Sequence, residues 1–255
     1  MNVAAERTLK IVSPIAVGVI IIAAWQLYAT FLQGKTALVP SPSAIIADFV
    51  EHFGVILSHT WITAGNALIG LLVGTVVAII LAALAAWLKV VDWMAAPIVA
   101  AIAVVPIVAL TPIFNAMFGA SSQFGRQAIA AIAAFVPVFI NVLRGLKQTK
   151  PVQRDLFRAY SASGPQTFRR LTLPTAVPYL MTGIRIASSV AVISALVAEY
   201  FGGPSDGLGT KIATVAKSGD QAFAWAFVFA SIAVGLVFFL ATLLLEWLVT
   251  RRRGS

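Results

Sequence analysis

Polar and ionisable side chains are concentrated in two neighbouring parts of this chain, the segment 146–174 and the hydrophobic stretch that follows it. The segment 146–174 carries six Lys or Arg residues and one acidic residue, Asp155, whereas the sequence on either side carries almost no charge. Loops rich in Lys and Arg resist translocation across a membrane. We therefore expect this segment to lie on the cytoplasmic side and to offer a docking surface rather than a catalytic one.

The hydrophobic stretch 175–199 combines Arg185, Ser188, Ser189, Ser194 and Glu199, and we expect the other hydrophobic stretches to hold few hydrogen-bonding side chains. An ionisable group inside a membrane helix costs about 3 kcal/mol or more and usually faces protein or water. Ser188 and Ser189 follow Arg185 by three and four residues, so they lie on its side of a helix. This pattern predicts a path for a small polar solute. In the alternative interpretation, Arg185 extends to the membrane surface and Glu199 pairs with a loop group.

The composition excludes several other kinds of chemistry. The chain has no cysteine and two histidines, His52 and His59, so a thiolate or His-rich metal site is not expected. An intramembrane enzyme would need Ser with His, or paired Asp, within the hydrophobic segments, and none is present. The net charge of +9 is not arranged as a basic stripe with interleaved aromatics, which argues against nucleic acid as a partner.

Hydrophobicity places the chain in a membrane. Sixty per cent of its 255 residues are hydrophobic, 11% are charged and the mean hydropathy is +0.95, whereas about a quarter of residues are charged in soluble domains. A helix needs about 20 apolar residues to cross the hydrocarbon core. We predict an all-α membrane protein that forms one domain over residues 1–255, without an internal repeat. Its six spans are expected near residues 11–32, 60–88, 93–112, 127–143, 175–199 and 221–249, with a short re-entrant or external segment after the third.

The distribution of basic residues predicts that both termini are cytoplasmic. In this topology thirteen of the eighteen Lys and Arg residues lie inside, Lys35, Arg126, Lys211 and Lys217 lie outside, and Arg185 lies within the membrane. Residues 36–58 then form an external connector, in which an amphipathic helix starts after Ser41-Pro42-Ser43.

Inside the basic segment, residues 155–174 predict two short helices around a turn. Asp155–Tyr160 can form the first helix, and Ser163 is a suitable N-cap for the second, followed by Gly164 and Pro165. Phe168 and Leu171 share one face of that second helix. Pro174 and Pro178 are expected where the chain re-enters the membrane.

This stretch resembles the cytoplasmic signature of the permease subunits of ATP-binding-cassette importers. The family pattern is Glu-Ala-Ala, three residues, Gly, nine residues, a branched aliphatic residue, one residue, then Leu-Pro. Asp155, Ser161, Leu171 and Leu173-Pro174 keep this spacing, although Leu156-Phe157 replace the two alanines and Ser161 replaces the glycine. Residues 60–84, 106–119 and 184–209 are similar to permeases of the nitrate, sulfonate and taurine class, and in part to the branch for pyrimidine-type vitamin precursors.

The resemblance implies a type I importer permease in the bacterial inner membrane that works as a dimer, expected to be a homodimer. Its partners would be two cytoplasmic ATPases and an external substrate-binding protein, and ATP with Mg²⁺ would be bound by the ATPases, because this chain has no GxxxxGK[ST] phosphate loop. No cofactor or metal is expected in the chain itself. The residues that would couple to the ATPase are Asp155, Tyr160, Ser161, Ala162, Ser163, Gly164, Pro165, Phe168, Leu171, Leu173 and Pro174. A stand-alone secondary transporter or channel is the alternative function, but it leaves the 155–174 pattern unexplained.

Overall fold

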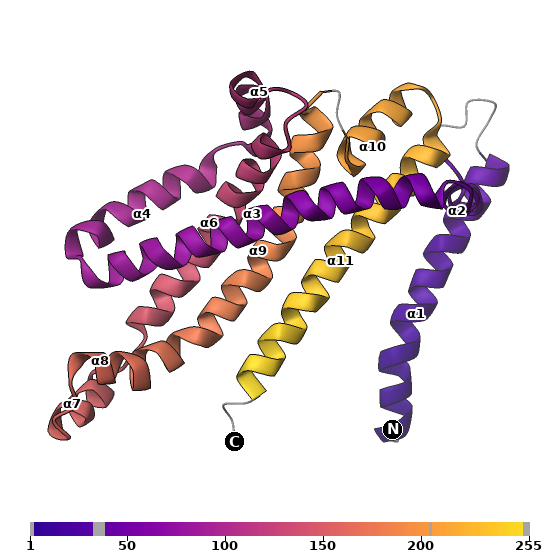
Figure 1. The fold of residues 1–255 in the computed structure, drawn as a ribbon. Helices are drawn as coiled ribbons and strands as arrows, with labels where there is room; N and C mark the ends of the chain where they lie inside the picture. Colours follow the sequence, from indigo (N-terminus) through magenta and orange to yellow (C-terminus); the bar gives the residue numbers. More distant parts are fainter. Residues whose placement is uncertain (1–2, 33–38, 204–205, 252–255) are drawn as a thin grey trace.

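The computed structural model describes residues 3–32, 39–203 and 206–251, and all regular elements within them are helices (Figure 1). Five helical stretches are long and apolar enough to cross a membrane. They are α1 (Val3–Leu27) with the π-turn η1 (Tyr28–Leu32), α3 (Phe53–Trp87), α6 (Gln123–Lys147), α9 (Leu173–Phe201) and α11 (Gln221–Arg251). The bent pair α4 (Lys89–Val104) and α5 (Ile107–Phe118) adds a sixth candidate crossing if the two helices form one broken span. The predicted all-helical architecture is confirmed, and five or six candidate spans are present among the described residues, depending on how the bent pair is counted.

The centre of the bundle is α6, which packs most extensively against α3 on one side and α9 on the other. Small residues make this approach possible. A Cβ atom at Gly70 or Gly74 of α3 would overlap Ala130 or Ala131 of α6, and one at Gly183 of α9 would press on the backbone at Val138. Membrane helices gain contact chiefly by such close approach, because lipid is as apolar as the side chains. Alanine accordingly dominates the buried core.

The third crossing differs from the straight span expected at 93–112. Helix α4 ends at Val104, and α5 departs from it at 89°. Pro106 lacks a backbone N–H and restricts the residue before it, and Val105 is accordingly extended with ψ of 122°. The helix expected over 93–112 is therefore broken at this proline, and α5 begins after it.

Two other spans, α3 and α6, are longer than their hydrophobic segments suggested. Helix α3 starts at Phe53, within the expected connector, and its 35 residues correspond to about 52 Å of helix. Helix α6 starts at Gln123, where the Ser122 hydroxyl accepts a hydrogen bond from the N–H of Phe124 at 3.2 Å. Arg126 was counted as an external loop residue, but it lies in the first turns of α6. Arg126 can be buried at this helix end because the carbonyls of Ala120 and Ser122 and the side chain of Gln123 accept its N–H groups, as described below.

The fifth span is continuous with the second short helix of the basic segment. Helix α8 (Gly164–Thr167), the π-turn η2 (Phe168–Thr172) and α9 follow one another without a break. Pro174 lies in the first turn of α9, where its missing N–H costs little, and the wider turn of η2 precedes it. The prolines therefore do not separate the basic segment from the membrane helix.

The N-terminal end of α1, the C-terminal end of α11 and the pair α7 (Pro151–Ala159) and α8 lie together at one end of the bundle, which we call the loop end (Figure 1). The helices α2 (Pro42–Glu51), α5 and α10 (Leu208–Lys217) lie at the opposite end, which we call the far end. The expected connector helix is α2, capped by the Ser41 hydroxyl, which accepts from the N–H of Ala44 at 3.3 Å. Lys35, Arg252 and Arg253, which were used in the topology prediction, lie outside the described residues.

Helix α1 contacts the rest of the bundle near its C-terminal end. The ring of Trp25 makes an edge contact with Trp225 of α11, its Nε1–H donates to the carbonyl of Pro40 at 3.1 Å, and Gln26 donates to Ser43 at 3.0 Å. No part of its hydrophobic window is buried. Lipid or another protein chain must therefore cover most of α1.

The close approach of α3 and α6 generates the first prediction. Gly74→Ala should push the two helices apart and lower the free energy of unfolding by about 1–3 kcal/mol, the usual cost of overpacking. The matched control is Gly65→Ala on the same helix, where an added Cβ would have no atom within 4 Å. Thermal unfolding of the purified protein measures the stability of both variants, and equal melting temperatures would contradict this packing.

Candidate functional site

The polar segment at the loop end folds as predicted around a sharp turn. Helix α7 begins with Pro151 in its first turn, and the Gln153 side chain accepts the N–H of Lys150 at 3.0 Å. Its apolar side chains Val152, Leu156 and Tyr160 are four residues apart and are 77%, 55% and 80% exposed. Because four residues bring side chains back to nearly the same face, they form one stripe. We call these three residues the α7 stripe.

The turn after α7 explains the position at which the family pattern has glycine. Ser161 has φ of +53° and is the one described residue other than glycine with a positive φ. The N–H of Ser161 donates to the carbonyl of Arg158 at 2.8 Å, and the N–H of Ala162 donates to the carbonyl of Phe157 at 2.9 Å. This pair of bonds is the Schellman motif, which places its left-handed residue at the position of Ser161. A side chain there costs about 1–2 kcal/mol relative to glycine, so Ser161 holds a strained turn.

The second half of the segment is anchored on the end of α3. Ser163 begins α8 as predicted, with its N–H bonded to the Gln166 side chain at 2.8 Å. The ring of Phe168 makes an edge contact with Trp87 at a centroid distance of 6.1 Å. Gly164 and Pro165 form the first turn of α8 and are exposed, whereas Leu171 is partly buried. Leu173 and Pro174 are exposed at the start of α9.

The carboxylate of Asp155 forms a local pair on α7. It accepts from Arg158 at 3.2 Å, and both side chains are mostly exposed. An exposed pair of this kind contributes little to stability, about 0–1 kcal/mol. Asp155 therefore remains available to a partner at the loop end.

Arg185 has a direct partner on another helix. Its Nε atom lies 3.3 Å from Oε2 of Glu246 in α11, and Oε1 of Glu246 accepts from the Thr182 hydroxyl at 3.0 Å. Both charged side chains are more buried than exposed. Removing one member of a buried ion pair leaves the other charge buried without a partner, which is destabilising.

The three serines of the predicted path have different surroundings. Ser188 is fully buried, donates to the carbonyl of Arg185 at 2.7 Å and lies 3.1 Å from the Thr242 hydroxyl of α11. Ser194 is also fully buried. Ser189 lines an apolar groove of about 580 Å³ between α9, α10 and α11. The three are thus spread around α9, and Ser189 is the one that faces an open groove.

Glu199, the last of the predicted path residues, lies at the centre of a buried polar network at the far end. Its carboxylate accepts from the Thr63 hydroxyl at 2.7 Å, the Asn66 amide at 3.1 Å and the N–H of Gly209 at 3.1 Å. Glu199 is 0% exposed. A carboxylate can be buried when several donors replace the lost water. Thr63 and Asn66 belong to α3 and Gly209 to α10, so these partners of Glu199 come from helices and not from a loop.

The same network fixes the start of α10. The Thr63 hydroxyl accepts the N–H of Leu208 at 2.8 Å, and Nδ1 of His59 accepts the N–H of Gly207 at 3.2 Å. Gly207 has φ of +126°, and a Cβ atom there would overlap the carboxylate of Glu199. Helix α10 is therefore held on α3 and α9 through its first backbone amides.

Arg126 joins this network from α6. Its Nη1 donates to the Gln123 side chain at 3.1 Å, and that oxygen also accepts from Asn66 at 2.8 Å. Its Nη2 donates to the carbonyl of Ala120 at 2.8 Å, and the residue is 1% exposed. Two opposite charges, Arg126 and Glu199, are thus linked through amide side chains.

The expectation that the other spans hold few hydrogen-bonding side chains was wrong. Thr63 and Asn66 on α3 and Gln123 and Gln127 on α6 all contribute to the network, the last by donating to Asn66 at 3.2 Å. Their three- and four-residue spacing in each segment was an available signal, since it places each pair on one helix face.

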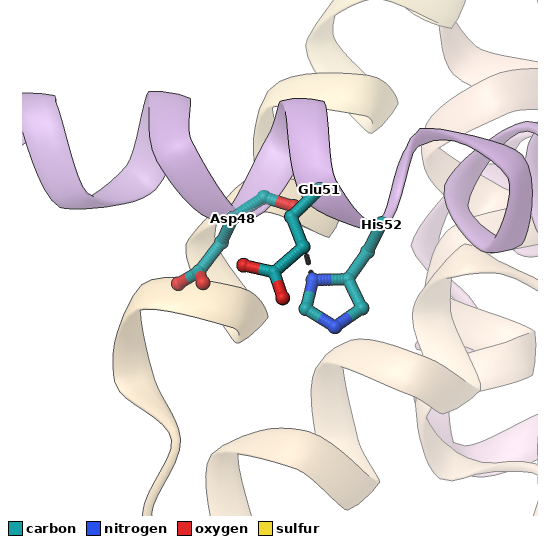
Figure 2. A group of neighbouring side chains, drawn as sticks. All are labelled: Asp48, Glu51 and His52. Carbon is teal, nitrogen blue, oxygen red and sulfur yellow. Dashed lines mark hydrogen bonds between the residues drawn. The ribbon is translucent and has the colours of Figure 1, made fainter.

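One group of metal-ligating side chains lies outside the network, at the end of α2. Asp48, Glu51 and His52 project from the same part of the helix, and their ligand atoms lie within 4.8 Å of one another (Figure 2). Nδ1 of His52 lies 3.2 Å from the carbonyl of Asp48, and its ring stacks on Phe223. Burial, and then the negative charge of Asp220, raise the pKa of Asp48. Carboxylates with an imidazole are ligands for a divalent cation, and this is the group of described residues best suited to hold one.

Taken together, the fold and the loop define an integral membrane protein with an exposed, charged loop at one end and no catalytic constellation among its described residues. The model of the family described as "binding-protein-dependent transport system inner membrane component" matches residues 74–254, so the chain belongs to that family. It is a permease subunit, a multi-pass protein of the inner membrane.

Individual relatives agree with this assignment. A formylaminopyrimidine transport permease protein of Halalkalibacterium halodurans is 31% identical over 80% of this chain and 81% of that protein. A nitrate import permease protein of Leptolyngbya laminosa is 30% identical over 61% of this chain and 54% of that protein. The crystal structure of an amino acid ABC transporter with histidines has the same fold, with a TM-score of 0.64 and 16% identity over 81% of this chain and 97% of that chain. The resemblance stated from the loop and the flanking segments is confirmed.

The network around Glu199 generates the second prediction. Glu199→Ala leaves the donors of Thr63, Asn66 and Gly209 without their acceptor and removes the charge opposite Arg126. We expect the free energy of unfolding to fall by about 3–5 kcal/mol and the amides of 207–217 to exchange hydrogen faster. The control is Glu51→Ala, which removes an exposed carboxylate at the same end. Unchanged exchange in α10 of the Glu199 variant would contradict this role.

Proposed function

We propose that this permease forms one half of a dimer in an ATP-driven importer and that it docks a cytoplasmic ATPase through the loop 155–174. The observation that carries the proposal is the α7 stripe, an exposed apolar face on a charged loop. Exposed apolar surface rimmed by polar residues marks sites of protein association. The ATPase would supply the chemistry, because this chain has no phosphate loop of its own.

The connection between the loop and the bundle supports coupling. Helices α8 and α9 are joined by the π-turn η2 with no break, so a movement of the loop is passed directly to the fifth span. ATP binding would close two ATPases and draw two such loops together, which favours the outward-facing state of the permease. Such a shift requires contacts that differ between the two states, and the docked loops provide a place for them.

The exposed face of α9 supports dimer formation. Ile186, Ile193 and Tyr200 are spaced by seven residues and are 45%, 59% and 43% exposed, next to the groove of about 580 Å³ that Ser189 lines. A seven-residue repeat forms a seam along one side of a helix, as in coiled coils. We place the second copy of the permease against this seam, with the solute path between the copies and close to Arg185 and Ser189.

The solute we propose is a small polar or flat heterocyclic molecule, delivered to the far end by an external binding protein. The relative from Halalkalibacterium halodurans supports a nitrogen heterocycle by its name, and the relative from Leptolyngbya laminosa supports a small anion. The apolar groove beside Ser189 favours the heterocycle, since flat rings pack well on aliphatic side chains.

The proposed orientation can be tested by cysteine labelling, because the chain has no native cysteine. A cysteine in place of Lys150 at the loop end should react with a membrane-impermeant maleimide only from the inside. One in place of Lys217 at the far end should react only from the outside, and both side chains are exposed. The opposite pattern at either position would reverse the topology.

The Schellman turn leads to a prediction on coupling. Ser161→Gly should preserve ATPase binding and stabilise the turn by about 1 kcal/mol, because glycine has no Cβ penalty at positive φ. Ser161→Pro fixes φ near −65° and should abolish binding, as should Leu156→Asp within the α7 stripe. Co-purified ATPase and its stimulated hydrolysis are the measurements.

The control for the stripe is Val90→Asp, which places the same charge at an aliphatic position, 64% exposed, outside the loop. It should retain the ATPase. Full co-purification of the ATPase with both the Ser161→Pro and the Leu156→Asp variants would contradict the docking proposal.

The pair Arg185–Glu246 allows the path to be separated from folding. Arg185→Met alone leaves Glu246 without its partner and should reduce assembly. The double variant Arg185→Met with Glu246→Met removes both charges and should restore assembly, but uptake into vesicles with the binding protein should stay at least ten-fold reduced. Recovery of uptake together with assembly would mean that Arg185 is structural.

A further inference from the structure

Helix α7 has a second face, which the α7 stripe does not use. Arg154 and Arg158 are four residues apart, and each lies two residues from a member of the stripe, which is about 200° around a helix. Arg154 is held toward the bundle, because its Nε donates to the hydroxyl of buried Thr149 at 2.7 Å. The guanidinium groups therefore lie on the side of α7 away from the proposed ATPase contact.

These two arginines line a groove of about 400 Å³ between the loop and the end of α3. Its other walls include Trp87, Leu146 and Phe168, and Thr167 adds a hydroxyl. No carboxylate is among the residues that line it, although Asp155 pairs with Arg158 nearby. The groove is thus cationic on its α7 side and apolar on the side of the spans.

The position of the groove is that of a membrane surface. Trp87 is the last residue of α3 and is 71% exposed, and its ring contacts Phe168 at the edge of the groove. Tryptophan at the end of a span lies at the level of the lipid headgroups. A ligand here would meet guanidinium groups from the loop and an aromatic wall from the membrane side.

We propose that this groove binds the phosphate-bearing headgroup of an anionic phospholipid. A guanidinium is suited to bind phosphate oxygens in pairs, and the apolar wall can receive the glycerol and the first acyl carbons. A soluble anion would use the arginines but not the aromatic wall. A bound headgroup ties α7 to the end of α3 and so restrains the loop that faces the ATPase. The inference rests on the cytoplasmic placement of the loop proposed above, but not on ATPase docking.

The test uses the full-length permease without its partners. Native mass spectrometry of the protein in detergent, titrated with phosphatidylglycerol or phosphatidylcholine, measures retained lipid. We expect retention of phosphatidylglycerol, and about five-fold weaker binding in Arg158→Gln, which corresponds to about 1 kcal/mol per arginine near a charged surface. The double variant Arg154→Gln with Arg158→Gln should lose roughly 25-fold. Glycerol 3-phosphate should not displace the lipid.

The matched control is the double variant Arg169→Gln with Arg170→Gln, which removes the same charge from the same loop at positions that do not line the groove. It should bind phosphatidylglycerol within two-fold of the unchanged protein. An equal loss in both double variants would show general attraction and overturn the site. Displacement by glycerol 3-phosphate would identify a soluble anion instead. In a separate capture experiment with the ATPase, loss of co-purification by the Arg154→Gln with Arg158→Gln variant while its lipid binding stays intact would identify a protein-docking groove instead.

Discussion

The close packing of α6 between α3 and α9 is the contact on which the other features of this permease depend. Glycine and alanine at the two interfaces let the backbones approach until their atoms touch. The approach of α3 and α6 brings Asn66 within hydrogen-bonding distance of Gln123 and Gln127, and it brings Thr63 and Asn66 to Glu199 on α9. At the opposite end, α6 leads directly into α7 and α9 receives the chain from α8, so the same three helices carry the loop.

The features that local sequence could predict are those that depend on neighbours along the chain. Ser41 and Ser163 cap their helices because the capping partner of each is three residues away. The turn at Ser161 could be anticipated from the spacing of the family pattern, since a Schellman motif requires a left-handed residue there. The bend at Pro106 also had a local signal, although its angle of 89° depends on what α5 packs against.

The features that local sequence could not predict are pairings between helices. The acceptors of Arg126 are local, since they come from the preceding turn and from Gln123. The link to another helix is the bond from Asn66 of α3 to Gln123, which local sequence does not predict. Glu246 lies only five residues before Arg251 in the sequence, but in the bundle it faces Arg185 and Thr182. A hydropathy profile reports how apolar a segment is, and it contains no information on which polar side chains meet across a helix interface.

The placement of charge separates the two ends of the molecule. At the far end Arg126 and Glu199 are buried and connected by amide side chains. Breaking this network would cost free energy, because it would leave buried charges without partners, and the network therefore favours one fixed position of α10. At the loop end the charges of α7 are exposed and weakly paired, so they can exchange partners at little cost. The membrane helix that joins the ends, α9, begins as the continuation of the loop and finishes in the network. A displacement applied to the loop therefore meets its strongest resistance at Glu199. Because α10 is bonded to that residue, opening of the far end must either carry α10 along as one unit with α9 or break the hydrogen bonds of its first amides.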